Sequence, residues 1–364
     1  MDSSLEALDP KSAPSAESKK APPSMTPESH GESAAKSSPE SHSTHDTHPP
    51  KRPKGNLCGP LSKNLAWNAR QGPLLLAGTV TIGPGVSLTI GAGTEIRIGS
   101  YDSCPDSGAV AGGHSIALVV RGGTLLIAGL PDKPIVFKPL AEARGFLWEG
   151  IRIEKSSRDQ DATLRWFELS RASKGVSFLA GAGRIDHGVI EDCGIGIASL
   201  LGASPTVTHS VLSRSVVADV VSSRSATRIL SCLFLDGRGD AIRFDGVGLS
   251  EIATSCFWGH RGSVVVRGPA GLGGWKSDSV PDPFGNWRRD PVLRESNQHQ
   301  ILLAQSRKSL AGQPWWKSRR PPEDPPGTGR WALSPFSPMI DRGETRFCSD
   351  SDGSKCDIGL WGGK

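Results

Sequence analysis

The sequence predicts an all-β solenoid with about 22 residues per coil, and three observations support this fold class. Aliphatic residues recur at spacings of 21, 22, 22 and 23, at Leu164, Ile185, Val207, Ile229 and Ile252. A small or polar residue followed by a β-branched one repeats in step, at Gly175-Val176, Gly196-Ile197, Asp219-Val220, Ala241-Ile242 and Ser263-Val264. The 44 glycines and 28 prolines suit many short strands with tight corners. So short a period holds three short strands but no helix pair.

The expected strands begin at Leu74, where aliphatic residues alternate with others between Gly-Pro-Gly and Gly-Ala-Gly corners as far as Ile98. Period-two alternation bounded by glycine is typical of strands and turns. Further strands are expected at 116–120, 125–127, 134–137 and 148–153, before the regular repeats. We expect roughly eight coils by Val266, and no segment has a helical period of useful length.

Composition divides the chain into three parts. Residues 1–54 are rich in Ser, Pro, Glu, Lys, Ala and His, and such a segment buries too little apolar surface to fold, so we expect a disordered arm. Four of the nine histidines lie in this arm: His30, His42, His45 and His48. Residues 55–268 are expected to form the solenoid, and 269–364 an irregular C-terminal segment that packs on it.

Charge and hydropathy predict neither nucleic-acid binding nor a transmembrane segment. The formal net charge of +5 is mild, and no basic stripe is dense enough to predict nucleic-acid binding. No stretch reaches the ~18 apolar residues of a membrane span, so no transmembrane segment is expected. The residues Met1–Glu6 have neither the basic start nor the apolar core of a signal peptide.

The seven cysteines point to an oxidising compartment. Cys348 and Cys356 bracket a short polar loop, as in a disulfide-closed hairpin, and Cys58 with Cys104 would tie the start of the fold. Since disulfides persist outside the reducing cytosol, we expect an extracellular or cell-envelope protein. The other three lie beside apolar residues within the repeats and are expected to be buried: Cys193, Cys232 and Cys256.

Several runs carry a resemblance to a known family. The runs are 78–82, 85–90, 122–137, 148–151, 286–291, 337–343 and 357–359. Over residues 56–363 the chain resembles bacterial surface and secreted right-handed parallel β-helix proteins, of the polygalacturonase-like superfamily. The resemblance implies a single-stranded right-handed parallel β-helix. It leaves the activity open, because such proteins include adhesins, surface-display rods and polysaccharide-active enzymes.

Asp219, Asp240 and His260 are the candidate catalytic residues, spaced by 21 and 20. Two carboxylates and an imidazole are the groups that glycoside hydrolysis uses. The series looks like the catalytic ladder of polygalacturonases, but Ala241 stands where their adjacent second Asp would be. The register also drifts along the series, and the alternative is that both carboxylates bind turn amides.

The substrate-binding Arg-x-Lys element of polygalacturonases has no clear counterpart. Three residues match it only in charge: Arg267, Lys276 and Arg288. Five tryptophans at or after the last coils offer faces for sugar rings or cover the open end of the solenoid: Trp258, Trp275, Trp287, Trp315 and Trp316.

Asp350, Asp352 and Asp357 form a candidate calcium site, because alternating carboxylates around a glycine resemble oxygen-ligand loops. The loop lacks the distal Glu of an EF-hand. The alternative is a disulfide-closed turn in which Asp357 accepts local amide hydrogen bonds.

The expected function is a non-catalytic cell-surface or secreted scaffold that presents a β-face to a glycan or a surface protein. The alternative is a polysaccharide hydrolase or lyase that uses Asp219, Asp240 and His260. A third possibility, a cytoplasmic structural rod, requires all seven cysteines to be free.

Overall fold

The computed structural model divides the chain into two units, Met1–Pro49 and Pro50–Lys364. The residues that the structure describes all belong to the second unit: 56–99, 116–140, 145, 148–154, 162–245, 250–266, 282, 284–293, 331–334, 337–343 and 355–360. The expected arm at 1–54 lies outside them. No helix with the length and hydropathy of a membrane span occurs in the described part of the chain.

The described residues form an all-β fold with a single 3₁₀ turn, η1 (Ala69–Gln71), and 22 strands in one sheet. The strands are β1 (Asn56–Pro60), β2 (Leu65–Trp67), β3 (Leu74–Ile82), β4 (Ser87–Gly91), β5 (Glu95–Ile98), β6 (Ala117–Arg121), β7 (Thr124–Ala128), β8 (Ile135–Pro139), β9 (Gly150–Glu154), β10 (Ala162–Ser170), β11 (Lys174–Leu179), β12 (Ala182–Glu191), β13 (Ile195–Leu200), β14 (Ser204–Thr208), β15 (Val211–Ser213), β16 (Ala218–Ser223), β17 (Arg228–Leu230), β18 (Leu233–Leu235), β19 (Asp240–Asp245), β20 (Glu251–Ala253), β21 (Cys256–Trp258) and β22 (Val265–Val266).

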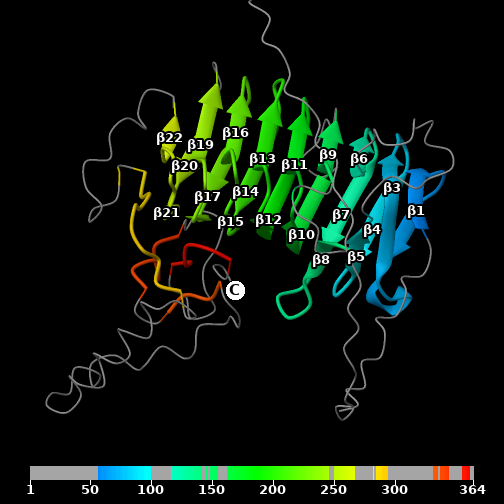
Figure 1. Ribbon diagram of the computed structural model, residues 1–364, viewed down its shortest axis with the longest axis horizontal. Coiled ribbons are helices and arrows are strands. Elements are labelled where there is room, and N and C mark those ends of the chain that lie inside the picture. The colour runs from blue at the N-terminus through cyan, green and yellow to red at the C-terminus, as the bar shows by residue number, and fades with distance from the viewer. Residues whose placement is uncertain are drawn as a thin grey trace, which may run out of the picture. The chain divides into compact units, whose positions relative to one another are not determined.

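These strands stack in three parallel columns. One column runs β3, β6, β9, β11, β13, β16, β19, β22, and Figure 1 shows its arrows side by side in chain order. A second runs β2, β4, β7, β10, β12, β14, β17, β20. The third runs β5, β8, β10, β12, β15, β18, β21, with the long strands β10 and β12 shared between two columns. This parallel, three-column arrangement is that of a β-solenoid.

The predicted aliphatic ladder is confirmed by the register of the second column. Leu164 pairs with Ile185, and the ladder continues through Val207, Ile229 and Ile252. All five side chains are buried in the main core. Apolar residues that stack directly above one another remove a continuous surface from water, which is the main driving force for such a fold.

The second predicted repeat holds in four coils and is wrong in the fifth. Val176, Ile197, Val220 and Ile242 occupy one column, but the residue that continues it is Val265. The fifth pair is therefore Val264-Val265, one residue later than expected. Because residues 264–266 are all valine, the sequence does not show which of them continues the column, and a coil of 23 residues cannot be distinguished from one of 22.

Each corner of the coil places a non-glycine residue in the left-handed backbone region, which is uncommon for such residues. One corner has positive φ at five residues one coil apart, with values from 45° to 55°: Trp166, His187, His209, Ser231 and Thr254. A second corner repeats the same feature at Arg171, Asp192, Arg214 and Asp236. The repeated backbone conformation means that corner side chains stack on one another, as strand side chains do.

The described C-terminal residues pack against the third column. On β15 and β18, Leu212 and Phe234 face the main core, whereas Val211 and Leu233 belong to a second apolar cluster. C-terminal residues complete that cluster: Trp287, Leu333, Met339, Ile358 and Leu360. A Cβ atom at Gly359 would lie 2.7 Å from Leu233 Cδ1, so this segment approaches the strands closely.

The three cysteines within the repeats are buried, as the sequence predicts. Cys193, Cys232 and Cys256 are free and buried, and burial raises the pKa of each thiol to about 12. These thiols are therefore packing residues without thiolate reactivity at neutral pH. Each expected disulfide includes a cysteine outside the described residues, Cys104 in one and Cys348 in the other.

Candidate functional site

Asp219 and His260 meet inside the last coils. Asp219 is the second residue of β16, and His260 follows β21 after Gly259. His260 Nε2 lies 2.7 Å from Asp219 Oδ2, and the side chains are 2% and 0% exposed. The structure therefore brings together two of the three candidate catalytic residues, 41 positions apart in the sequence.

The two residues lie nearly two coils apart, and glycines in the intervening coil leave space for the contact. A Cβ atom at Gly237 would lie 2.3 Å from His260 Cδ2, a distance at which atoms overlap. In the strand column, Asp219 takes the position that Gly196 and Ala241 occupy in the neighbouring coils. The small residues in the coils above and below leave space for the Asp219 carboxylate.

One atom of each partner remains without a hydrogen bond. Asp219 Oδ1 and His260 Nδ1 are buried and have no hydrogen-bond partner among the described residues. A proton on Nε2 makes the hydrogen bond to the carboxylate, and Nδ1 of a neutral ring is then an acceptor. An imidazole held in this way by a carboxylate has the orientation that general bases use.

Asp240 belongs to a separate group. Its Oδ2 accepts hydrogen bonds from Arg243 Nη2 at 2.7 Å and Nε at 3.2 Å, and its Oδ1 accepts one from the Ser263 amide at 2.8 Å. Burial raises the pKa of Asp240, but these hydrogen bonds outweigh it and the net pKa is lowered. No hydrogen bond joins Asp240 to Asp219 or His260 among the residues that the structure describes. Register explains this, since Asp240 pairs with Ala218.

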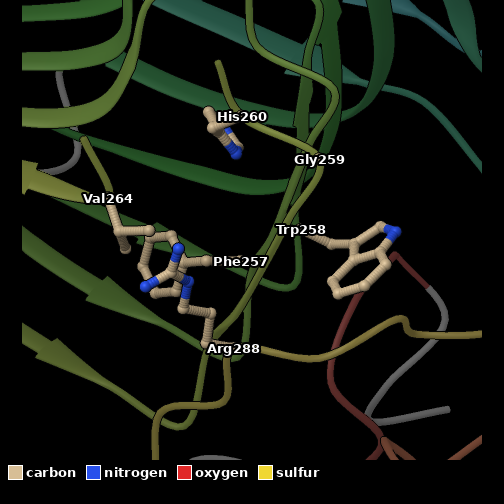
Figure 2. A pocket seen from close by; sticks show the side chains of 6 residues that line it. All are labelled: Phe257, Trp258, Gly259, His260, Val264 and Arg288. Carbon is tan, nitrogen blue, oxygen red and sulfur yellow. The ribbon is translucent and has the colours of Figure 1, made fainter. Parts of the chain in front are cut away.

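A pocket of about 120 Å³ lies beside the Asp219–His260 pair. Figure 2 shows the lining residues: Phe257, Trp258, Gly259, His260, Val264 and Arg288. The Arg288 side chain extends toward Phe257 and Val264, while the Trp258 indole lies apart from them and is exposed. The pocket is smaller than the ~300–1,000 Å³ of sites that enclose drug-sized ligands. Its lining thus combines an exposed indole with a guanidinium that lies apart from it.

Asp186, His187 and His209 form a second cluster, which the sequence reasoning missed. Asp186 Oδ1 lies 3.0 Å from His187 Nδ1 and 3.3 Å from His209 Nδ1, and all three residues are buried. Thr208 Oγ1 donates to the same oxygen at 2.7 Å. Candidate ligand atoms of the three residues all lie within 4.8 Å of one another, so the cluster has the composition and spacing of a metal-binding group.

The charge of this cluster is set by its hydrogen bonds. Burial raises the pKa of Asp186, but the His187 imidazole beside it and the hydrogen bonds from His209 and Thr208 outweigh burial and hold the pKa well below its usual range. Arg165 Nε lies 3.3 Å from the other oxygen, Oδ2. Asp186 is therefore a carboxylate with donors around both oxygens.

The two imidazoles of this cluster stack with a tryptophan at the same corner. The ring of His187 lies 4.1 Å from that of Trp166 and 5.0 Å from that of His209, centroid to centroid. The available sequence signal was the spacing of 22 between His187 and His209, which equals the coil period.

The remaining sequence candidates lie apart from both groups or outside the described residues. Asp350 and Asp352 of the expected calcium site are outside them, while Asp357 Oδ1 accepts the Asp341 amide at 2.9 Å. Trp287 packs in the second apolar cluster beneath Arg342, whose guanidinium lies 5.7 Å from its ring. The other named tryptophans and cations are also outside: Trp275, Trp315, Trp316, Arg267 and Lys276.

Comparison with known proteins finds no family model that matches the chain, no curated relative and no similar solved structure.

Proposed function

We propose that this protein is a non-catalytic β-helix scaffold of the cell surface or the extracellular space, and that its pocket binds an acidic glycan. The single observation that carries the proposal is Trp258, which is 42% exposed in a pocket that Arg288 also lines. An exposed indole offers an apolar face on which a sugar ring stacks, and a guanidinium suits a sugar carboxylate.

The ionisable groups support binding without catalysis. Hydrolysis of a glycosidic bond uses two carboxyl groups on either side of that bond. Asp219 is fully buried against His260, and Asp240 is held by Arg243. With neither carboxylate open to the pocket, a bound sugar meets an aromatic ring and a cation, which hold it in place.

Binding to polygalacturonate and to a neutral glucan, measured by calorimetry on the full chain, tests this proposal. We expect Trp258→Ala to weaken polygalacturonate binding about tenfold or more, because the substitution removes the apolar face on which the sugar ring stacks. Phe284→Ala is the matched control, since Phe284 is 46% exposed and does not line the pocket. Absence of binding, or equal losses in both variants, contradicts the proposal.

A second candidate function is a polysaccharide hydrolase or lyase, and the 2.7 Å contact between Asp219 and His260 beside the pocket favours it. In this alternative His260 acts as the general base and Asp219 orients it. Release of reducing ends or of unsaturated sugars from the same polymers tests it. Activity that His260→Asn abolishes, in a variant that still folds, replaces the scaffold proposal with this one.

We also propose the finer description of the fold, a single-stranded right-handed parallel β-helix like those of the polygalacturonase-like superfamily. Its support is the parallel three-column stacking, together with the strong preference for right-handed crossovers between parallel strands. Surface location and disulfides Cys58–Cys104 and Cys348–Cys356 belong to the same proposal. Thiol titration of the unfolded chain then finds three free thiols, whereas a cytoplasmic rod gives seven.

A further inference from the structure

The corner that carries Trp166, His187 and His209 assembles a donor set typical of a metal site. Asp186 and His187 lie within β12, and His209 lies between β14 and β15, one coil later. We propose that Asp186, His187 and His209 bind one divalent transition-metal ion, of the zinc type, which links two successive coils.

The distances between donor atoms match those around such an ion. Asp186 Oδ1 lies 3.0 Å from His187 Nδ1 and 3.3 Å from His209 Nδ1. Tetrahedral zinc with ligand bonds of about 2.0–2.2 Å separates its ligand atoms by roughly 3.3–3.5 Å. The two aspartate–histidine separations are close to this value, and candidate ligand atoms of all three residues lie within 4.8 Å of one another.

The backbone and the neighbouring side chains hold these donors in place before any ion binds. His187 and His209 share the left-handed conformation, with φ of 55° and 45°, so both imidazoles leave the chain at equivalent points of the corner. Trp166 stacks on His187 and fixes its plane, while the Thr208 hydroxyl holds Asp186. Partners that orient the ligands in this way commonly contribute 10- to 100-fold to metal affinity, as an order of magnitude.

The chemistry of the donors selects the class of ion. Two imidazole nitrogens and one carboxylate oxygen suit Zn²⁺ and its first-row neighbours, whereas Ca²⁺ and Mg²⁺ prefer an all-oxygen set. Three protein ligands leave one tetrahedral position for a water molecule, and the burial of all three residues keeps larger ligands from that position.

Among the described residues, Arg165 is the arginine or lysine whose side chain forms an ion pair with Asp186, and its charge opposes metal binding. Its Nε lies 3.3 Å from Oδ2, on the oxygen away from the imidazoles, and its side chain is 55% exposed. An exposed guanidinium can turn toward solvent when the ion binds. Arg165→Gln should therefore tighten zinc binding by about three- to tenfold, through removal of one positive charge.

The experiment measures metal in the full chain after dialysis, with His30, His42, His45 and His48 replaced by Ala so that the N-terminal histidines add no background. We expect about one zinc per chain, and a cobalt-substituted form with the intense visible absorption of tetrahedral Co²⁺. His209→Phe keeps an aromatic ring for stacking and removes both nitrogens, and Asp186→Asn keeps the shape of the carboxylate. Each should lower the retained zinc at least tenfold, an effect of the size expected for loss of one ligand.

His260→Asn is the control, since it removes a buried imidazole outside the cluster and should leave the zinc content unchanged. Circular dichroism and thermal unfolding establish that each variant folds. Zinc should also raise the melting temperature of the parent and leave that of His209→Phe unchanged. The proposal is overturned if the parent holds no zinc after supplementation, if folded Asp186→Asn and His209→Phe retain it, or if His260→Asn loses it equally.

Discussion

Two groups of aspartate and histidine occur in the same solenoid and form in different ways. In the cluster of Asp186, His187 and His209, the two histidines are 22 residues apart, share one corner conformation and stack directly. Asp219 and His260 are 41 residues apart and occupy different kinds of position, one in a strand and the other after a strand. The histidines of the first group are separated by one coil period of 22 residues, whereas the spacing of 41 in the second group is not a multiple of that period.

The difference shows that a spacing of one coil is neither necessary for contact nor sufficient by itself. Residues one coil apart become neighbours when their backbone conformations match, as at His187 and His209. Residues out of register meet only where the intervening coil has no side chain in the way, as at Gly237. A rule that accepts only residues at one level of the coil finds the first group and rejects the second.

The largest expected effect comes from breaking the out-of-register pair. His260→Ala leaves the Asp219 carboxylate buried without a partner, and we expect the free energy of unfolding to fall by about 3–5 kcal/mol, measured by urea denaturation. The double variant with Asp219→Ala should recover part of this loss, because Gly196 and Ala241 show that the column accepts small residues. Equal destabilisation in the single and double variants would show that packing, not charge, is the cause.

A substitution in the intervening coil tests whether glycine permits the contact. Gly237→Ala places a Cβ atom 2.3 Å from His260 Cδ2, and we expect a loss of about 1–3 kcal/mol together with displacement of the imidazole. Gly83→Ala is the matched control, since a Cβ atom there has no neighbour within 4 Å. Urea midpoints of the two variants should therefore separate clearly, and similar midpoints would contradict the steric explanation.

The in-register cluster should give a smaller, pH-dependent effect. Asp186→Asn removes charge-assisted hydrogen bonds, so we expect a loss of about 1.5–3 kcal/mol at pH 7 without metal. The folded-state pKa of Asp186 lies well below its usual range, so this stabilisation is complete above the unfolded pKa of about 3.9 and decreases progressively as the pH falls from there toward the folded-state pKa. Thermal unfolding from pH 7 to pH 3 should show the two proteins converging at the acid end. A constant difference would contradict the assignment.

The smallest expected effect is at the surface of that cluster. Arg165→Gln removes an ion pair whose guanidinium is half exposed, and such pairs contribute about 0–1 kcal/mol. The urea midpoint should shift little, and less at high salt. A shift as large as that of Asp186→Asn would mean that Arg165 has a structural role.

Much of the fold followed from the sequence, because the aliphatic ladder repeats in every coil. The register of Leu164, Ile185, Val207, Ile229 and Ile252 was predicted residue by residue. The repeat predicted Val264 as the partner of Ile242, whereas the partner is Val265, because three consecutive valines cannot be distinguished by hydropathy. The candidate site was only partly predictable: Asp219 and His260 were named, but no pattern in the sequence separates Asp240 from them.

The sequence by itself determined the coil length, the number of strands in each coil and the buried ladder, because hydrophobic burial repeats with the chain and is visible as a period. Only the tertiary structure decided which ionisable groups meet. Contact between Asp219 and His260 depends on space beside Gly237, and the Asp186 cluster depends on a left-handed corner that His187 and His209 share. Both are short-range steric conditions: the first leaves no repeating pattern in the sequence, and the second leaves only the spacing of 22 between His187 and His209.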